Sequence, residues 1–151
     1  MTKKVFVSGC FDMLHSGHIE FFCQAAQYGD LYVALGSDGT VYELKNRLPV
    51  NGEQERLFMV QAVRWVKEAF ISTGSGMLDF ENELRTLKPD YFVVNADGDT
   101  PEKRTLCDAL GIEYIVLERK PREGLQARST TALRGGDYLP YRIDLAGGWL
   151  D

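Results

Sequence analysis

The sequence predicts an α/β fold of the Rossmann-like type, with a doubly wound parallel sheet of five strands and helices on both faces. Short runs rich in β-branched and aromatic residues alternate with longer segments whose apolar residues recur at helical spacing. The alternation runs through five strands without a repeat or a low-complexity tract, which is typical of strand–helix–strand units in a parallel sheet. The 151 residues are enough for one domain with a substantial core.

The individual elements follow from the spacing of apolar residues and from signals at the segment ends. The expected strands cover residues 5–8, 31–36, 69–72, 91–94 and 113–117. The expected helices cover residues 17–28, about 52–66, 77–87 and 101–110. Gly29 and Gly111 are expected to end the first and last of these helices. Residues 37–51 contain Gly39, Pro49 and several polar residues, so this segment is expected to be a loop. Ligands of such sheets bind at the carboxyl ends of the strands, here the loops after Val7, Leu35 and Val94.

Charge and composition exclude several classes of protein. Seventeen basic against 22 acidic residues give a net charge of −5, which argues against broad nucleic-acid binding through a basic face. No stretch approaches the roughly 20 apolar residues of a membrane span, and the apolar run near the N-terminus is too short for a signal peptide. Cys10, Cys23 and Cys107 form no C-x-x-C pair, which favours reduced thiols. We therefore expect a cytoplasmic protein with no membrane association.

The junction between the first strand and the first helix carries the strongest signal of chemistry. The two histidines of the chain, His15 and His18, both lie there, with Gly17 between them at the start of the helix. A helix N-terminus offers unpaired amides and a positive dipole, both of which suit a phosphate group. Two imidazoles at that point can also stabilise charge that develops on a phosphate under attack.

This junction resembles the signature of the cytidylyltransferase-like nucleotidyltransferases. The pattern Gly-x-Phe-Asp-x-Leu-His-x-Gly-His spans residues 9–18. By that resemblance His15 and His18 are catalytic and contact the triphosphate, and Asp12 organises the loop. The resemblance also implies a nucleotide pocket lined by Gly9, Cys10, Phe11, Asp12 and Gly17. Many relatives have threonine or serine where this chain has Cys10.

Other interpretations of the histidine pair have less support. A structural metal site would need two more ligands at suitable spacing, and the sequence does not offer them. Surface histidines without a function would not explain the whole pattern after a strand. A dinucleotide-binding fold would place Gly-x-Gly-x-x-Gly at this turn, and that motif is absent.

A second candidate phosphate site follows the fifth expected strand, in a segment with several cationic residues. Ser129 is a natural N-cap for a short helix, and hydroxyls and amides there could hold phosphate. The family carries Arg-x-x-Gly-Ile-Ser-Thr-Thr at this place, which Ser129, Thr130 and Thr131 match. The family arginine corresponds either to Arg122, as a substrate ligand, or to Arg128, as a catalytic residue.

Three further segments gain a role from the resemblance. Relatives place a lysine against the phosphates in the loop that here holds Lys45, and an arginine at the start of the next helix, here Arg56, for substrate binding. The family has a Gly-Asp-Asp or Gly-Gly-Asp element near the nucleotide after the fourth strand. Asp97 and Asp99 occupy that position, although turn chemistry alone would also explain them.

The end of the chain is expected to lie outside the nucleotidyltransferase domain, which covers residues 1–136. Residues 137–151 include Pro-Tyr-Arg-Ile-Asp-Leu-Ala-Gly-Gly, which resembles the first strand and turn of the galactose–homoserine–mevalonate kinase family. The resemblance favours a truncated second domain with kinase activity. A C-terminal strand that packs on the domain or on a partner is the alternative.

Together the resemblances imply transfer of CMP from CTP to a phosphorylated polyol or sugar, with release of pyrophosphate. The same chemistry with ATP and a sugar phosphate is the alternative, as is a nucleotide-binding regulatory module without turnover. The expected partners are CTP or ATP, a phosphorylated small-molecule acceptor and Mg²⁺ bound with the nucleotide. We expect a homodimer and no metal site made by the protein alone.

Overall fold

The computed structural model describes residues 2–134, and its core is one parallel sheet. The five strands lie in the order β3-β2-β1-β4-β5, which confirms the predicted fold class. Their bounds are β1 Lys4–Gly9, β2 Asp30–Leu35, β3 Val66–Ile71, β4 Tyr91–Asn95 and β5 Glu113–Leu117. The predicted kinase-like segment, residues 137–151, lies outside the described residues.

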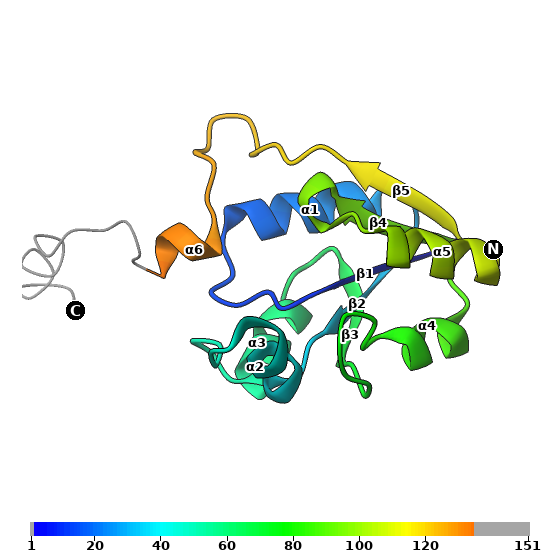
Figure 1. Ribbon diagram of the computed structural model, residues 1–151. Coiled ribbons are helices and arrows are strands. Elements are labelled where there is room, and N and C mark those ends of the chain that lie inside the picture. The colour runs from blue at the N-terminus through cyan, green and yellow to red at the C-terminus, as the bar shows by residue number, and fades with distance from the viewer. Residues whose placement is uncertain (1, 135–151) are drawn as a thin grey trace, which may run out of the picture.

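Helices cover both faces of the sheet, as Figure 1 shows. Their bounds are α1 Ser16–Ala26, α2 Asp38–Lys45, α3 Glu53–Gln61, α4 Glu81–Leu87, α5 Pro101–Leu110 and α6 Thr130–Leu133, with a 3-10 turn, η1, at Ala96–Gly98. No helix in the described part of the chain is both long and apolar enough to cross a membrane.

Two apolar clusters, one on each face, hold these helices to the sheet. Successive strand residues point to opposite faces, so Val5 and Val7 enter one cluster and Phe6 enters the other. The first cluster takes Phe22 of α1 and the second takes Leu84 of α4, both fully buried. The central strands are therefore apolar on both sides, which explains their continuous apolar runs in the sequence.

The structure corrects four boundaries in the prediction. The expected loop of residues 37–51 contains α2, which Ser37 caps by accepting a hydrogen bond from the Thr40 amide at 3.1 Å. The helix expected over about residues 52–66 corresponds to α3 and ends at Gln61, and Val66 is the first residue of β3. The expected helix of residues 77–87 starts only at Glu81, after a turn. The helix α1 ends at Ala26, with Gln27 as its C-cap, rather than at Tyr28 before Gly29.

The strand order reverses at β1, and this reversal places the site. The strands β1 and β2 pair along six residues, whereas β1 and β4 pair only at Val5–Tyr91 and Phe6–Phe92. The carboxyl halves of β1 and β4 therefore part, and a crevice opens between them, as expected for a doubly wound sheet. The short helix α6 follows β5 in the chain and lies beside the start of α1, next to this crevice (Figure 1).

Candidate active site

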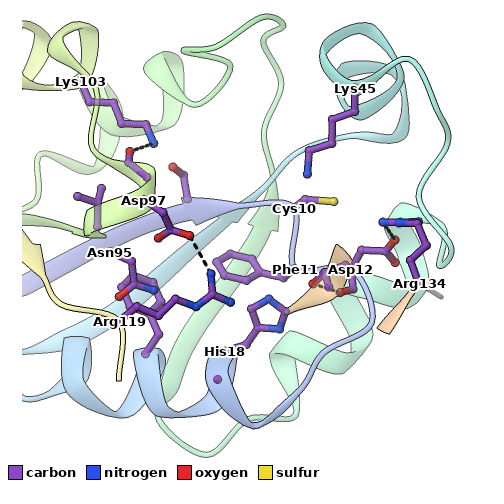
Figure 2. Close-up of a pocket in the computed structure, with 16 residues that line it drawn as sticks. Cys10, Phe11, Asp12, His18, Lys45, Asn95, Asp97, Lys103, Arg119 and Arg134 are labelled. Carbon is purple, nitrogen blue, oxygen red and sulfur yellow. Dashed lines mark hydrogen bonds and ion pairs between the residues drawn. The ribbon is translucent and has the colours of Figure 1, made fainter. Parts of the chain in front are cut away.

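A cavity of about 240 Å³ opens where β1 and β4 part. Figure 2 shows basic side chains entering it from several elements. Its lining consists of Ser8, Cys10, Phe11, Asp12, Gly17, His18, Phe21, Lys45, Val94, Asn95, Asp97, Gly98, Lys103, Arg119, Thr130 and Arg134. The cavity thus combines the loop after β1, the loop after β4 and the start of α6, which lie far apart in the sequence.

The loop between β1 and α1 is held in a strained conformation. Phe11 and Met13 both have positive φ angles, 53° and 49°, in the left-handed region that bulky residues rarely adopt. Burial of the Phe11 ring offsets this cost, since the ring packs on Phe22 at a centroid distance of 4.9 Å and meets His18 edge-on at 5.5 Å. The same ring covers Gly9, where any Cβ would come within 2.9 Å of it.

The two histidines stack against each other at the start of α1. Their ring centroids are 3.8 Å apart. His15 is the N-cap, and its Nδ1 accepts a hydrogen bond from the Gly17 amide at 3.0 Å, while Nδ1 of His18 accepts one from the His15 amide at 3.2 Å. A Cβ on Gly17 would lie 2.9 Å from the His15 ring, so a glycine between the histidines permits this capping geometry.

Both imidazoles are neutral in this environment. Burial lowers the pKa of His18 to about 3, helped by the nearby His15 and Arg119. Burial also lowers the pKa of His15, with Arg119 and Arg128 adding to the effect. Because each Nδ1 accepts a hydrogen bond, each neutral ring carries its proton on Nε2. The Nε2 of His15 is buried and has no partner among the described residues.

Three cationic side chains line the cavity together with His18, and a fourth, Arg134, pairs with Asp12. Lys45 ends α2, Lys103 lies on α5, and Arg119 follows β5, so they reach the cavity from different sides (Figure 2). Lys103 donates to the Gly98 carbonyl at 2.8 Å, and burial lowers the pKa of its ammonium group. Arg119 pairs with Asp97 at 2.8 Å. The cavity is therefore cationic although the whole chain is acidic.

Asp12 fixes the floor of the cavity. Its carboxylate, 2 % exposed, accepts hydrogen bonds from the Val50 and Asn51 amides at 2.6 and 2.9 Å and pairs with Arg134 at 3.2 Å. Burial alone would raise the pKa of Asp12, but the two amides and Arg134 outweigh burial and lower it. The Asp12 carbonyl also accepts a hydrogen bond from Thr130 at 3.3 Å. Asp12 therefore ties the loop before α3 and the helix α6 to the loop after β1.

The structure brings about half of the predicted site residues into the cavity wall. Those in the lining are Cys10, Phe11, Asp12, Gly17, His18, Lys45, Asp97 and Thr130. Those outside it are Gly9, His15, Arg56, Asp99, Arg122, Arg128, Ser129 and Thr131. His15 and Gly9 nevertheless shape the wall, since His15 stacks on His18 and Gly9 lies under Phe11.

Several of the outlying residues are engaged elsewhere in the fold. Asp99 pairs with Arg104 at 2.7 Å and accepts from the Tyr114 hydroxyl. Arg122 pairs with Glu20 of α1 at 2.8 Å. The side chain of Ser129 caps α6, as predicted, by accepting from the Ala132 amide at 3.1 Å. The exposed Arg128 contributes its backbone carbonyl, which accepts from Arg119 at 3.1 Å.

Arg56, which the sequence predicted to bind substrate, is instead an internal anchor. Its side chain is 0 % exposed, and its guanidinium donates to the carbonyls of Cys10, Gly36 and Asn51 at 2.8–2.9 Å. It also pairs with Asp38 at 2.8 Å. The structure does not bring Arg56 to the cavity, because the loops after β1 and β2 close over it.

Sequence reasoning missed Lys103, Arg119, Arg134 and Asn95. Lys103 is one of several charged residues on α5, and only the packing of α5 on the sheet turns it inward. Asn95 follows Val94 at the end of β4, where the rule about strand carboxyl ends could have found it. Arg119 comes two residues after β5, so the same rule applies to it. Arg134 offered no signal in the sequence.

Comparison with known proteins adds independent information. A family model described as cytidylyltransferase-like matches residues 6–135. The FAD synthase of Methanopyrus kandleri is 38% identical over 107 residues, which are 68% of this chain and 69% of that protein. The bifunctional protein HldE of Campylobacter fetus is 43% identical over 129 residues, which are 84% of this chain. The aligned segment spans only 26% of HldE.

Solved structures resemble the fold at lower sequence identity. The lipopolysaccharide core biosynthesis protein from Thermoplasma volcanium superposes with a TM-score of 0.67 at 23% identity, covering 82% of this chain and all of that chain. Pantothenate synthetase from Thermus thermophilus superposes with a TM-score of 0.61 at 15% identity, covering 95% of this chain and 64% of that one. These likenesses concern the fold alone.

The Arg56 anchor leads to a prediction about stability. Arg56→Ala leaves three buried carbonyls and the Asp38 carboxylate without their donor, so we expect a loss of about 3–5 kcal/mol in the free energy of unfolding. Arg56→Lys should recover only part of that loss, because an ammonium group cannot reproduce the planar fork. Chemical denaturation followed by circular dichroism measures both values.

Arg85 is the matched control for this experiment. It pairs with Glu81 one turn away on the exposed side of α4, so Arg85→Ala should change stability by no more than about 0.5 kcal/mol. Equal effects of the two alanine variants would contradict the role assigned to Arg56.

The histidine environment leads to a prediction about titration. The lowered pKa of His18 means that its imidazole stays neutral from pH 8 down to pH 5, so its proton resonances should not shift over that range. The unfolded chain takes up this proton near pH 6.5 and the folded chain only near pH 3, so His18 makes folding less favourable as pH falls between these values. NMR of the two histidines, assigned with His15→Asn and His18→Asn, measures this. A His18 signal that titrates near pH 6.5 would refute it.

Proposed function

This chain belongs to the cytidylyltransferase-like family of nucleotidyltransferases, and we propose that it transfers AMP from ATP to a phosphorylated small-molecule acceptor, releasing pyrophosphate. The observation that carries the proposal is the cationic cavity at the start of α1. Lys45, Lys103 and Arg119 line this cavity together with His18, which stacks on His15, in a chain whose net charge is −5. A triphosphate is the kind of ligand that such a cavity suits.

The reaction needs no covalent bond to the protein. A phosphate oxygen of the acceptor attacks the α-phosphorus of the nucleotide and forms a new P–O bond. The bond from the α-phosphorus to the bridging oxygen breaks on the opposite side, and pyrophosphate leaves with the electron pair. A phosphate dianion has no proton to lose, so the protein needs no general base. Positioning and charge neutralisation therefore supply the catalysis.

The residues of the cavity divide this task. The Nε2–H of His18, and that of His15 behind it, are the donors we assign to the oxygens of the reacting phosphates. Each well-placed donor of this kind contributes about 3 kcal/mol to a reaction that develops charge. The cations Lys45, Lys103 and Arg119 would neutralise the triphosphate and the leaving pyrophosphate. The hydroxyl of Thr130, at the start of α6, adds a donor on the remaining side.

Magnesium would enter with the nucleotide. Residues 2–134 contain no group of three or more His, Cys, Asp or Glu side chains arranged to hold a metal ion. Asp12 and Asp97, the carboxylates of the cavity, are each paired with an arginine. This arrangement fits an ion held mainly by phosphate oxygens and water, with the exposed Asp97 as the group that would hold one of those waters. The ion supplies charge neutralisation on the triphosphate.

Relatives favour ATP over CTP as the donor. The FAD synthases, by their name, make a dinucleotide that contains adenylate, and several of them are more than 35% identical to this chain. CTP stays the alternative donor, and a nucleotide-binding module without turnover stays the alternative class. The first alternative predicts turnover of CTP and the second predicts no turnover of either nucleotide. One turnover assay with both nucleotides therefore separates these alternatives from the proposal.

We expect pyrophosphate release when the protein is given MgATP and a suitable phosphate ester. A screen of ATP and CTP against phosphorylated polyols, sugars and flavins, read as pyrophosphate formation, tests the proposal. Pyrophosphate release with CTP but not with ATP would show that CTP is the nucleotide donor. Tight nucleotide binding with no release from any pair would assign the chain to the regulatory class instead.

The histidines lead to a separate kinetic prediction. His15→Ala and His18→Ala should each lower kcat by about a hundredfold or more, because each removes a donor aimed at developing charge. Circular dichroism checks that the fold is intact. Exposed Glu102→Ala, on α5, is the control and should turn over like the wild type. Near-wild-type turnover by both histidine variants would contradict the catalytic role assigned to His15 and His18.

A further inference from the structure

A second cavity, of about 170 Å³, adjoins the first on the other side of β1. The two share four lining residues, Ser8, Cys10, Lys45 and Lys103, so the cavities adjoin at these residues. Beyond that junction the second cavity runs between α2 and the turn before α4. The mechanism described above uses the first cavity for the nucleotide and leaves the second one without a role.

Asp79 lies in the wall of this second cavity and is only 8 % exposed. None of the ion pairs among residues 2–134 includes it. The charged groups that face it are Glu83 from α4, Lys103 from α5 and Lys45 from α2. Burial, together with the repulsion from Glu83, raises the pKa of Asp79 to about 6. It is therefore a carboxylate at neutral pH without an ion-pair partner.

We propose that the second cavity binds the acceptor and that Asp79 accepts hydrogen bonds from its hydroxyl groups, so that the enzyme selects phosphate esters of polyhydroxylated compounds. The inference rests on the proposed nucleotidyl transfer and names the class of its acceptor. The acceptor phosphate would lie at the junction of the cavities, between Lys45 and Lys103. There it would face the nucleotide across β1, and the carbon skeleton would extend towards Asp79.

The chemistry of the wall favours this class of acceptor. A buried carboxylate that receives no donor from the ligand stays poorly solvated, which costs binding free energy. Hydroxyl groups supply such donors, whereas an alkyl or quaternary ammonium ester of phosphate supplies none. Apolar side chains, Val41 and Phe80 among them, line the rest of the cavity and suit the C–H faces of a sugar or polyol. The cavity thus has one polar wall, a phosphate end and an apolar remainder.

A merely structural role for Asp79 at the start of α4 is the competing explanation, because the neighbouring backbone amides of Asp79 and Phe80 act to lower the pKa of its carboxyl group, against the effect of burial. Gly36 offers a way to separate the two. A Cβ on Gly36 would lie 3.5 Å from Oδ2 of Asp79 and 3.7 Å from Cγ2 of Val41, which are ordinary contacts. Gly36→Ala should therefore fold normally and place a methyl group beside the carboxylate, inside the cavity.

The first experiment compares Asp79→Asn and Gly36→Ala with the wild type, using the best acceptor from the screen. We expect the KM for the acceptor to rise about 10–100-fold in each variant, as for the loss of a hydrogen bond to a charged group. The Kd for MgATP, from calorimetry, should change less than about twofold. Asp108→Asn, an exposed carboxylate on the outer side of α5, is the matched control and should leave both constants unchanged.

The second experiment uses pH and a deoxy analogue. Protonation removes the carboxylate, so the wild-type KM for the acceptor should rise as pH falls through about 6. The acceptor phosphate titrates in the same range, so the measured quantity is the ratio of KM between wild type and Asp79→Asn, which should approach one at pH 5. Asp79→Asn should raise the KM less for an acceptor that lacks one hydroxyl group than for the parent compound.

Two results would overturn the proposal. One is a KM for the acceptor that is unchanged in both Asp79→Asn and Gly36→Ala, and the other is a phosphate ester without hydroxyl groups, such as phosphocholine, used more efficiently than every hydroxylated phosphate ester. If no compound is turned over, the proposed function fails, but this inference is still decided by binding. Calorimetry of glycerol 3-phosphate and glucose 1-phosphate, with protein saturated by a non-hydrolysable ATP analogue, should then show binding by the wild type and weakened binding by Asp79→Asn. Equal binding, or none, would refute it.

Discussion

The buried guanidinium of Arg56 is the contact on which the site depends. It donates to backbone carbonyls in three loops, those of Cys10 after β1, Gly36 after β2 and Asn51 before α3. A buried charge is tolerated only when it is paired and its hydrogens are used, and Asp38 provides the opposite charge at 2.8 Å. Loops at the carboxyl end of a parallel sheet are not held by hydrogen bonds between strands. Here the planar guanidinium of Arg56, which has several donors, holds them together.

A second buried charge of opposite sign completes the arrangement. The carboxylate of Asp12 accepts a hydrogen bond from the Asn51 amide, and Arg56 donates one to the Asn51 carbonyl. The backbone of Asn51 is therefore held by both buried charges. The segment between α2 and α3 is fixed in this way relative to the loop after β1. The positive φ angles of Phe11 and Met13 fall in the same loop, and strain of this kind persists only where the surroundings impose it.

Local patterns in the sequence were sufficient for the fold and for one half of the site. The helix of residues 101–110 was predicted to the residue, because Pro101 and Gly111 mark its two ends. The histidine junction was likewise readable, since its capping contacts are all within three residues. Arg119 and Lys103 were missed because their role depends on how distant elements pack. The inward direction of Arg56 was missed for the same reason: a charged residue on an amphipathic helix is normally exposed.

The charge state of the histidines follows from this packing and bears on how the site works. Burial, with His15 and Arg119 adding to its effect, lowers the pKa of His18, so the free site holds its positive charge on lysine and arginine and keeps its imidazoles neutral. A neutral imidazole whose Nδ1 is occupied by a backbone amide has its N–H fixed in direction, and no proton must be taken up before it can donate. Donors oriented in advance lower the barrier because they need no reorganisation when charge appears on the phosphate. The backbone of the first turn of α1 therefore sets the chemistry of the two side chains that cap it.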